Sequence, residues 1–291
     1  MKKFITLMRD IGDLIVFKHS VFALPFIFIS MIVYSSQLNH TMWFGWRLLL
    51  LGLLAAISAR NFAMSFNRYA DKDIDKYNPR TATRPSVDGR IGEGNLKIFI
   101  VLNALVFIIV AYFINSLAFW FSFPILVILG GYSIFKRFSP IAHLVLGLSL
   151  GLAPIAGAIA IGGDIPAWSV ALCLGVSFWV AGFDLLYSLQ DMEYDMQNNL
   201  FSIPSIYGKD TTFFISKLFH AQTIIFWLFF VYLAHLGFFS YIGILVSAII
   251  LYQEHKIVTK DFTKIDKAFF TLNGYLGIIF FVLIWLDRMF A

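Results

Sequence analysis

Residues 47–75 read RLLLLGLLAAISARNFAMSFNRYADKDID, an apolar run that ends in two aspartates, Asp71 and Asp75, four positions apart. A second apolar run ends in the same way at Asp191 and Asp195. On a helix this spacing places both carboxylates of a pair on one face, about one turn apart. Carboxylates this close repel each other unless a cation lies between them, and hard oxygen ligands suit Mg²⁺. The two pairs therefore indicate diphosphate chemistry on a lipid-like substrate at a membrane boundary.

The composition places these pairs in a membrane protein. Of the 291 residues, 59% are hydrophobic and only 13% are charged, and the mean hydropathy is +0.80. These values lie far from those of an average soluble domain and predict an all-α polytopic membrane protein. Nine segments are long enough, or nearly so, to cross a bilayer as helices. They are residues 15–37, 47–66, 97–115, 117–135, 141–162, 166–187, 213–234, 236–252 and 269–286.

The basic residues predict the orientation of these segments. If the N-terminus is cytoplasmic, the connections on its side carry nearly all the Lys and Arg residues, and only Arg47 and Arg288 of the 22 fall clearly on the far side. We therefore expect the N-terminus inside and the C-terminus outside. This asymmetry accounts for the net charge of +5, so nucleic-acid binding is not expected. Cys173 is the only cysteine, which excludes an intramolecular disulfide.

Both aspartate pairs follow even-numbered segments, the second and the sixth, and are therefore expected on the cytoplasmic side together. Each pair is followed by a polar loop that contains proline, residues 78–85 and 197–204. The chain thus repeats a plan of membrane span, aspartate pair and loop. We expect one transmembrane domain over residues 1–291, built from two related halves of about 1–135 and 136–291, with a central cavity that opens to the cytoplasmic side.

Basic side chains near the pairs complete a candidate diphosphate site. Lys136 and Arg137 end the fourth segment, also on the expected cytoplasmic side, where they can neutralise a diphosphate. Arg80 and Arg84 lie in the loop after the first pair. Their planar guanidinium groups are suited to grip phosphate oxygens in pairs.

Other residues near the pairs have plainer interpretations. Asp73 and Glu193 fall off the shared face of their pairs and are expected to face water or to support the ligands from behind. His143, at the end of a span, is expected to be structural rather than catalytic. Glycines of the fifth span are expected to allow close helix packing. They are Gly147, Gly151, Gly157, Gly162 and Gly163.

Three sequence patterns resemble the signature regions of the UbiA superfamily of intramembrane aromatic prenyltransferases, and the resemblance spans nearly the whole chain. They are Asn67-x-x-x-Asp71-x-x-x-Asp75, Tyr132-x-x-x-Lys136 and Asp184-x-x-Tyr187-x-x-x-Asp191-x-x-x-Asp195. The resemblance implies that Asp71 and Asp75 hold one Mg²⁺ ion, with Asn67 assisting. It implies that Asp191 and Asp195 hold a second Mg²⁺ ion.

The same resemblance implies contacts to a prenyl diphosphate and to a small aromatic acceptor. The implied diphosphate contacts are Lys136, Arg137, Arg80 and Lys18, and Tyr132, Asp184 and Tyr187 belong to the substrate site. One departure is Arg68, which stands where many members of the superfamily carry another Asp. This change concerns the acceptor side of the pocket, where Arg68 is a candidate substrate contact.

Within the superfamily, the Asn-Arg-Tyr opening at residue 67 and the loop pattern Asn-Pro-Arg-Thr-x-x-Arg-Pro at residues 78–85 are most similar to the quinone-biosynthesis branch. This implies Mg²⁺-dependent transfer of a polyprenyl group to a ring carbon of a hydroxylated aromatic acid. The acceptor is either 4-hydroxybenzoate, for ubiquinone, or the naphthoate precursor of menaquinone. The implied location is the inner (plasma) membrane of a bacterium, among membrane lipids, with the active site on the cytoplasmic side.

Two alternatives stay open from the sequence. Another enzyme of this superfamily, such as haem O synthase or an intramembrane terpene synthase, would share the metal site and differ in the acceptor pocket. A secondary transporter would use intramembrane acids for ion coupling. The acids expected at one membrane face, rather than at its midplane, argue against the transporter.

Overall fold

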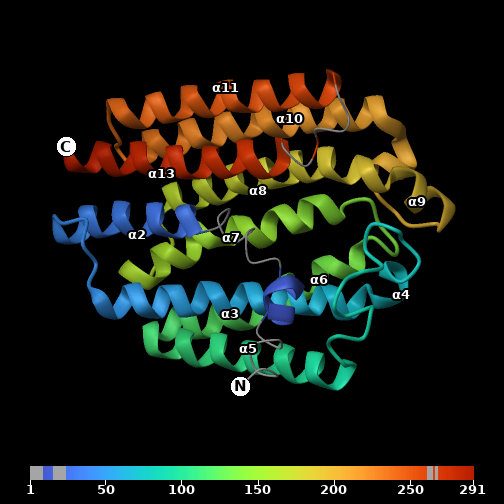
Figure 1. The fold of residues 1–291 in the computed structure, drawn as a ribbon. Helices are drawn as coiled ribbons and strands as arrows, with labels where there is room; N and C mark the ends of the chain where they lie inside the picture. The colour runs from blue at the N-terminus through green and yellow to red at the C-terminus, as the bar shows by residue number, and fades with distance from the viewer. Residues whose placement is uncertain (1–8, 16–23, 261–264, 266–267) are drawn as a thin grey trace. The chain divides into compact units, whose positions relative to one another are not determined.

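Long apolar runs become helices in this chain because a backbone within lipid must satisfy its own hydrogen bonds, and a helix does so within one segment. In the computed structural model, which describes residues 9–15, 24–260, 265 and 268–291, all regular secondary structure of those residues is helical. The longer helices (Figure 1) are α2 (Leu24–Asn39), α3 (Trp46–Ala70), α5 (Glu93–Ile114), α6 (Ser116–Phe135), α7 (Ala142–Gly162), α8 (Ala167–Ser188), α10 (Ile203–Leu233), α11 (Phe238–Lys260) and α13 (Asn273–Met289). The short elements are α4 (Lys72–Asp75), the 3₁₀ turn η2 (Leu189–Asp191), α9 (Met192–Gln197) and the π-helical turn η4 (Ala268–Leu272).

Eight helices in the described part of the chain are long and apolar enough to cross a membrane. One of them, Ala167–Gln197, combines α8, η2 and α9. The first predicted span corresponds to α2, which is apolar but has only 16 described residues. The prediction of an all-helical polytopic membrane protein is confirmed, whereas the count of nine spans and their orientation stay predictions.

One helix begins well before the predicted span. The sequence placed the start of the seventh span at residue 213, whereas α10 begins at Ile203. The reason is a capping box, in which the Ser202 hydroxyl accepts from the Ser205 backbone N–H and the Ser205 hydroxyl accepts from that of Ser202. Such a box satisfies backbone donors that a helix start leaves unpaired. The added residues are separated from the apolar part of α10 by a kink at Gly208, whose φ of 77° favours glycine.

The chain divides into two units, one formed by residues 1–20 and 50–134 and the other by residues 21–49 and 135–291. The described part of the first unit carries most of α3 with α4, α5 and α6. Its apolar core is built from side chains of α3, α5 and α6, of the helical segment 9–14 and of the loop before α5. The buried members are Leu14, Phe62, Ala63, Ile91, Leu96, Ile100 and Leu129.

The second unit is organised around α8. This helix packs along its length against α7 and α10 (Figure 1), and most of its side chains are buried. Its core is rich in aromatic residues: Trp179 lies 5.2 Å from Phe26 and 6.3 Å from Trp227, measured between ring centroids. Trp227 in turn stacks on Phe280 of α13 at 4.4 Å. The position of α8 matters for function because it leads directly into the second aspartate pair.

Glycines of α7 allow its neighbours to approach closely, as predicted. A Cβ atom added at Gly147 or Gly151 would collide with Ser177 on α8, and one added at Gly157 would lie 2.6 Å from a backbone oxygen of α2. Gly163 does not pack in this way, and its prediction was wrong. It follows the last turn of α7 with φ 74° and ends that helix in the left-handed conformation.

Candidate active site

The first aspartate pair lies where α3 changes into α4. Asp71 has φ −96° and ψ 4°, which ends α3, but the helical hydrogen bonds continue across it. The Asp71 N–H donates to the Asn67 carbonyl at 2.9 Å, and the Asp75 N–H donates to the Asp71 carbonyl at 2.7 Å. The side chains of Asp71 and Asp75 are buried, whereas Asp73 between them is exposed. This agrees with the predicted assignment of Asp73 to the water-facing side.

The second aspartate pair repeats this backbone geometry. Asp191 ends the 3₁₀ turn that follows α8 and precedes α9, with φ −98° and ψ 0°. Asp195 lies one turn later in α9, and both carboxylates are half-buried. Glu193 between them is exposed, as predicted. Each pair therefore starts at a short break after a long helix and continues on the next helical turn.

Asn67, Arg68 and Arg84 hold the first pair. The Asn67 amide donates to Asp71 Oδ2 at 2.8 Å, and its own oxygen accepts from Arg68 at 3.1 Å. Arg84 Nη1 forms an ion pair with Asp75 Oδ2 at 2.5 Å. Arg68 is buried and lies within electrostatic range of both carboxylates and of Tyr132. Two arginines thus neutralise the pair within the first unit.

The loop after the first pair folds back onto it. The Thr81 hydroxyl donates to the Asp75 carbonyl at 3.0 Å, and Asn78 Oδ1 accepts from the Arg80 backbone N–H at 2.9 Å. The Arg80 side chain is exposed. Further along the loop, slight burial raises the pKa of Asp88, but hydrogen bonds from Arg90 have the larger combined effect and lower it.

The second pair is tied to the start of α10. Asp195 Oδ2 accepts from the Ser202 hydroxyl at 2.9 Å, so one serine both caps α10 and holds the carboxylate. Lys136 is half-buried and lies within electrostatic range of Asp195. Its backbone carbonyl accepts from the Phe201 N–H at 2.7 Å, which fastens this segment to the loop before α10. Arg137 is exposed.

Asp184 contacts His143, a residue that its place at the end of a span predicts to be structural. His143 Nδ1 lies 2.7 Å from Asp184 Oδ2, and His143 also acts electrostatically on Asp195. Tyr187, one turn after Asp184, is half-buried against the aromatic core of the second unit. The two partners are 41 positions apart on α7 and α8, so no local sequence pattern links them. Lys18 lies outside the described residues.

The donors fit a metal ion that shares its coordination with a substrate. Within the described part of the chain, no group of three or more His, Cys, Asp or Glu residues is arranged to hold a metal by itself. Mg²⁺ seldom needs such a cage, because it binds through one or two carboxylates together with substrate phosphates. Asp71 with Asp75, and Asp191 with Asp195, each supply two carboxylates of this kind.

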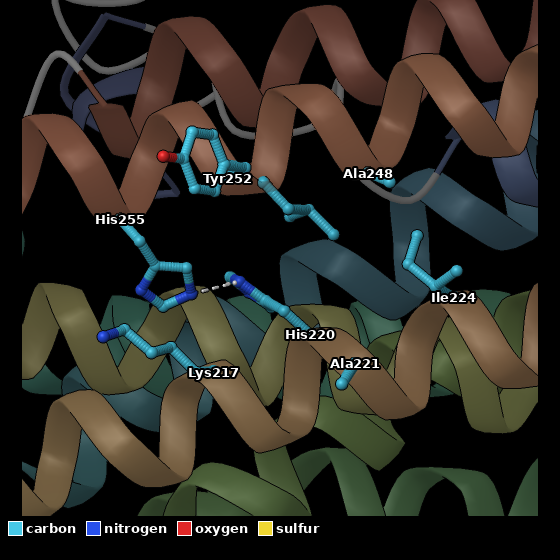
Figure 2. Close-up of a pocket in the computed structure, with 8 residues that line it drawn as sticks. Lys217, His220, Ala221, Ile224, Ala248, Tyr252 and His255 are labelled. Carbon is cyan, nitrogen blue, oxygen red and sulfur yellow. Dashed lines mark hydrogen bonds between the residues drawn. The ribbon is translucent and has the colours of Figure 1, made fainter.

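A separate, largely apolar cavity of about 180 Å³ lies between α10 and α11 and contains none of the predicted site residues. Figure 2 shows His220 and His255 facing each other across it, with 2.9 Å between His220 Nδ1 and His255 Nε2. Lys217 and Tyr252 lie at the same end, and apolar side chains line the rest. Beside His255 on α11, buried Glu254 accepts from Asn273 at 2.8 Å. These residues form a second polar cluster, distinct from the aspartate pairs.

Comparisons with known proteins show which family the chain resembles in sequence and fold. The model of the UbiA prenyltransferase family matches residues 23–284. A 4-hydroxybenzoate octaprenyltransferase of Serratia proteamaculans is 28% identical over 217 residues, which cover 74% of each chain. One of Yersinia enterocolitica is 26% identical over 244 residues, or 84% of each chain.

Solved structures show the same fold. The apo structure of a UbiA homolog from Aeropyrum pernix K1 has a TM-score of 0.83 and 28% identity, covering 92% of this chain and 98% of that one. A UbiA homolog from Archaeoglobus fulgidus bound to DMAPP and Mg²⁺ has a TM-score of 0.70 and 18% identity, covering 97% of this chain and 100% of that one.

Proposed function

The chain belongs to the UbiA prenyltransferase family, and from this premise we propose that it is an aromatic prenyltransferase of quinone biosynthesis. It transfers a polyprenyl group from polyprenyl diphosphate to a ring carbon of a hydroxylated aromatic acid, with two Mg²⁺ ions as cofactors. The observation that carries the proposal is the pair of matching aspartate sites. Each follows a long apolar helix, and each has a basic side chain within range of its carboxylates.

The favoured acceptor is 4-hydroxybenzoate. The support is the name of the curated relatives, 4-hydroxybenzoate octaprenyltransferase, together with the loop pattern of residues 78–85. The naphthoate precursor of menaquinone is the second candidate, because it is also a hydroxylated aromatic acid. Both candidate acceptors carry a carboxylate, which requires a cation when it is buried. Arg68, which is buried, is the proposed cation on the side of the pocket that binds the acceptor.

The reaction follows from charge. Asp71 with Asp75, and Asp191 with Asp195, would each hold one Mg²⁺, which would stabilise the negative charge that develops on the departing diphosphate. Lys136, Arg137, Arg80 and Lys18 would bind the phosphate oxygens, since arginine and lysine pair strongly with phosphate.

Arg84 has a related role in this proposal. Its guanidinium neutralises Asp75 through the 2.5 Å ion pair, and the same group is available to a phosphate once a cation replaces it there. Departure of the diphosphate leaves an allylic carbocation, which the electron-rich ring of the acceptor attacks. Apolar helices around the site would exclude the water that otherwise destroys the cation.

We further propose one domain that crosses the inner (plasma) membrane of a bacterium nine times, with the N-terminus in the cytoplasm. The aspartate pairs and the basic loops would then share the cytoplasmic side, in a central cavity that opens there. The support is the distribution of basic residues along the sequence. The prenyl chain would lie between helices and leave sideways into the lipid.

The decisive experiment is product analysis. Membranes that contain the chain would be incubated with a polyprenyl diphosphate, Mg²⁺ and, in turn, 4-hydroxybenzoate, the naphthoate acceptor, haem or no acceptor. We expect a lipid product whose mass equals that of the acceptor plus one prenyl group, formed only with an aromatic acid and only with Mg²⁺. A product from haem, or a cyclised product without acceptor, would replace this proposal with another enzyme of the family. Absence of any Mg²⁺-dependent diphosphate release would favour a transporter.

A further inference from the structure

In the hydrogen bond between His143 and Asp184, the chemistry of the two groups decides which of them donates the proton. An ionised carboxylate can only accept, so the 2.7 Å contact requires the proton on His143 Nδ1. A neutral His143 then presents a lone pair at Nε2. This atom is buried and has no hydrogen-bond partner within the described residues. A buried polar atom without a hydrogen bond destabilises the folded protein, unless a bound ligand supplies the missing hydrogen bond.

The surroundings of His143 indicate which ligand that is. The side chain is 6% exposed, sits in the first turn of α7, and lies within electrostatic range of Asp195. It therefore belongs to the candidate active site rather than to the aromatic core. An acceptor bound there carries one group that suits an imidazole lone pair, namely the hydroxyl on its ring. The carboxylate of the same acceptor carries no proton to donate at neutral pH.

We propose that His143 is the general base of the reaction and that Asp184 positions it, an inference that rests on the proposed function. Nε2 accepts the hydroxyl proton while the ring carbon beside the hydroxyl bonds to the allylic carbon. The electron pair of the O–H bond becomes the second bond of a C=O group. The ring hydrogen at the new bond then leaves to a diphosphate oxygen, and the ring oxygen regains its proton from Nε2. Proton and electron pairs balance, and His143 ends in its starting state.

Asp184 acts through His143 in this scheme. Its carboxylate fixes the tautomer that leaves Nε2 unprotonated, and it stabilises the imidazolium that forms during the step. This arrangement also explains why an acidic residue is useful in the Asp184 position of α8, apart from any direct contact with the substrate.

The test compares acceptors of different acidity. His143→Gln should lower kcat about a hundredfold or more with 4-hydroxybenzoate, the usual scale for a general base. With 3-fluoro-4-hydroxybenzoate, whose phenol is more acidic and depends less on a base for its ionisation, the ratio of wild-type to variant kcat should be smaller. Ser149→Ala on the same helix is the matched control, because the Ser149 hydroxyl donates to the Val145 carbonyl of its own helix. It should leave that ratio near one for both acceptors.

The possible outcomes distinguish a wrong assignment of the base from a wrong assignment of the enzyme's function. An equal loss with both acceptors overturns the base assignment, because a purely structural role does not depend on phenol acidity. If His143→Gln fails to bind prenyl diphosphate, Asp184→Asn carries the same comparison, and equal losses there would also overturn it. A wild-type protein that prenylates neither phenol would refute the proposed function, and the inference with it.

Discussion

The two buried carboxylates of the first pair are each stabilised by a different single residue. Asp71 Oδ2 accepts from the uncharged Asn67 amide, while Asp75 is paired with the Arg84 guanidinium at 2.5 Å. A buried acid without such partners would cost several kcal/mol, roughly the effective desolvation penalty of one ion. A site that binds a cation and then releases it needs partners of this kind, because its charge must be balanced in both states.

Asp71 and Asp191 are expected to be indispensable for turnover. Asp71→Asn and Asp191→Asn should each lower activity about a hundredfold or more, on the scale of removing one strong transition-state contact, because each pair loses half its negative charge. Exposed Asp73 provides the matched control, and Asp73→Asn should have a mild effect. Product formation by purified variants at saturating Mg²⁺ measures both. Retained activity in Asp71→Asn alongside loss in Asp73→Asn would show that the wrong face was assigned to the metal.

Lys136 is expected to act on the diphosphate and not on the acceptor. Lys136→Ala should raise the KM for prenyl diphosphate about tenfold or more, since a charged hydrogen bond contributes about 1.5–3 kcal/mol, and leave the KM for the aromatic acid nearly unchanged. Steady-state kinetics with each substrate varied in turn provides the measurement. The reverse pattern would place Lys136 in the acceptor pocket.

At the scale of helices, the start of α10 links stability to the site. Ser202 accepts from the Ser205 N–H and donates to Asp195 Oδ2. An N-cap serine typically contributes about 1 kcal/mol to stability. Here the same hydroxyl also donates to the Asp195 carboxylate, so the residue that caps α10 is tied to α9.

Ser202→Ala should therefore have two effects. Thermal stability should fall, and the Mg²⁺ concentration that gives half-maximal activity should rise, because Asp195 loses a donor that orients it. Ser205→Ala removes the other half of the box without touching Asp195 and should lower stability alone. A thermal-shift measurement and an Mg²⁺ titration of activity distinguish the two variants. Equal Mg²⁺ requirements would mean that Ser202 is only a cap.

Periodicity and composition predicted the helices of this chain well, but not their interruptions. Apolar runs give α3 and α8 directly, because a membrane span needs little beyond length and hydrophobicity. The breaks at Asp71 and Asp191 carry no turn residue such as Gly or Pro, so nothing local marks them. The same limit holds for the site. The i,i+4 spacing identifies the acids, whereas the contacts of Arg84 with Asp75 and of His143 with Asp184 form only when the chain folds.

For the whole molecule, the central question is which side of the membrane each connection occupies. The basic residues predict an answer from the sequence, since positively charged connections tend to remain in the cytoplasm. The proposed reaction makes the same demand on independent grounds, because both aspartate pairs must meet one diphosphate. The distribution of basic residues and the proposed reaction both require the two aspartate pairs on one side of the membrane. A measurement of the topology therefore tests the proposed function.

Cysteine labelling makes that test. In a Cys173→Ala background, single cysteines at Lys72, Lys136 and Gln197 should react with an impermeant thiol reagent only from the cytoplasmic side. Cysteines at Asn39 and Asp164 should react only from the other side. Cys173 is buried, and its replacement by the similarly small Ala leaves each introduced cysteine as the only thiol of its variant.

Bound substrate adds a second readout to the same set of variants. Prenyl diphosphate with Mg²⁺ should protect the first three cysteines, because the loops that carry them would contact the phosphates, and should not affect the outer two. Labelling of the Lys72 and Gln197 positions from opposite sides would put a bilayer about 30 Å thick between the two aspartate pairs. No diphosphate could reach both pairs across that distance, so this result would exclude prenyl transfer by the proposed two-metal site.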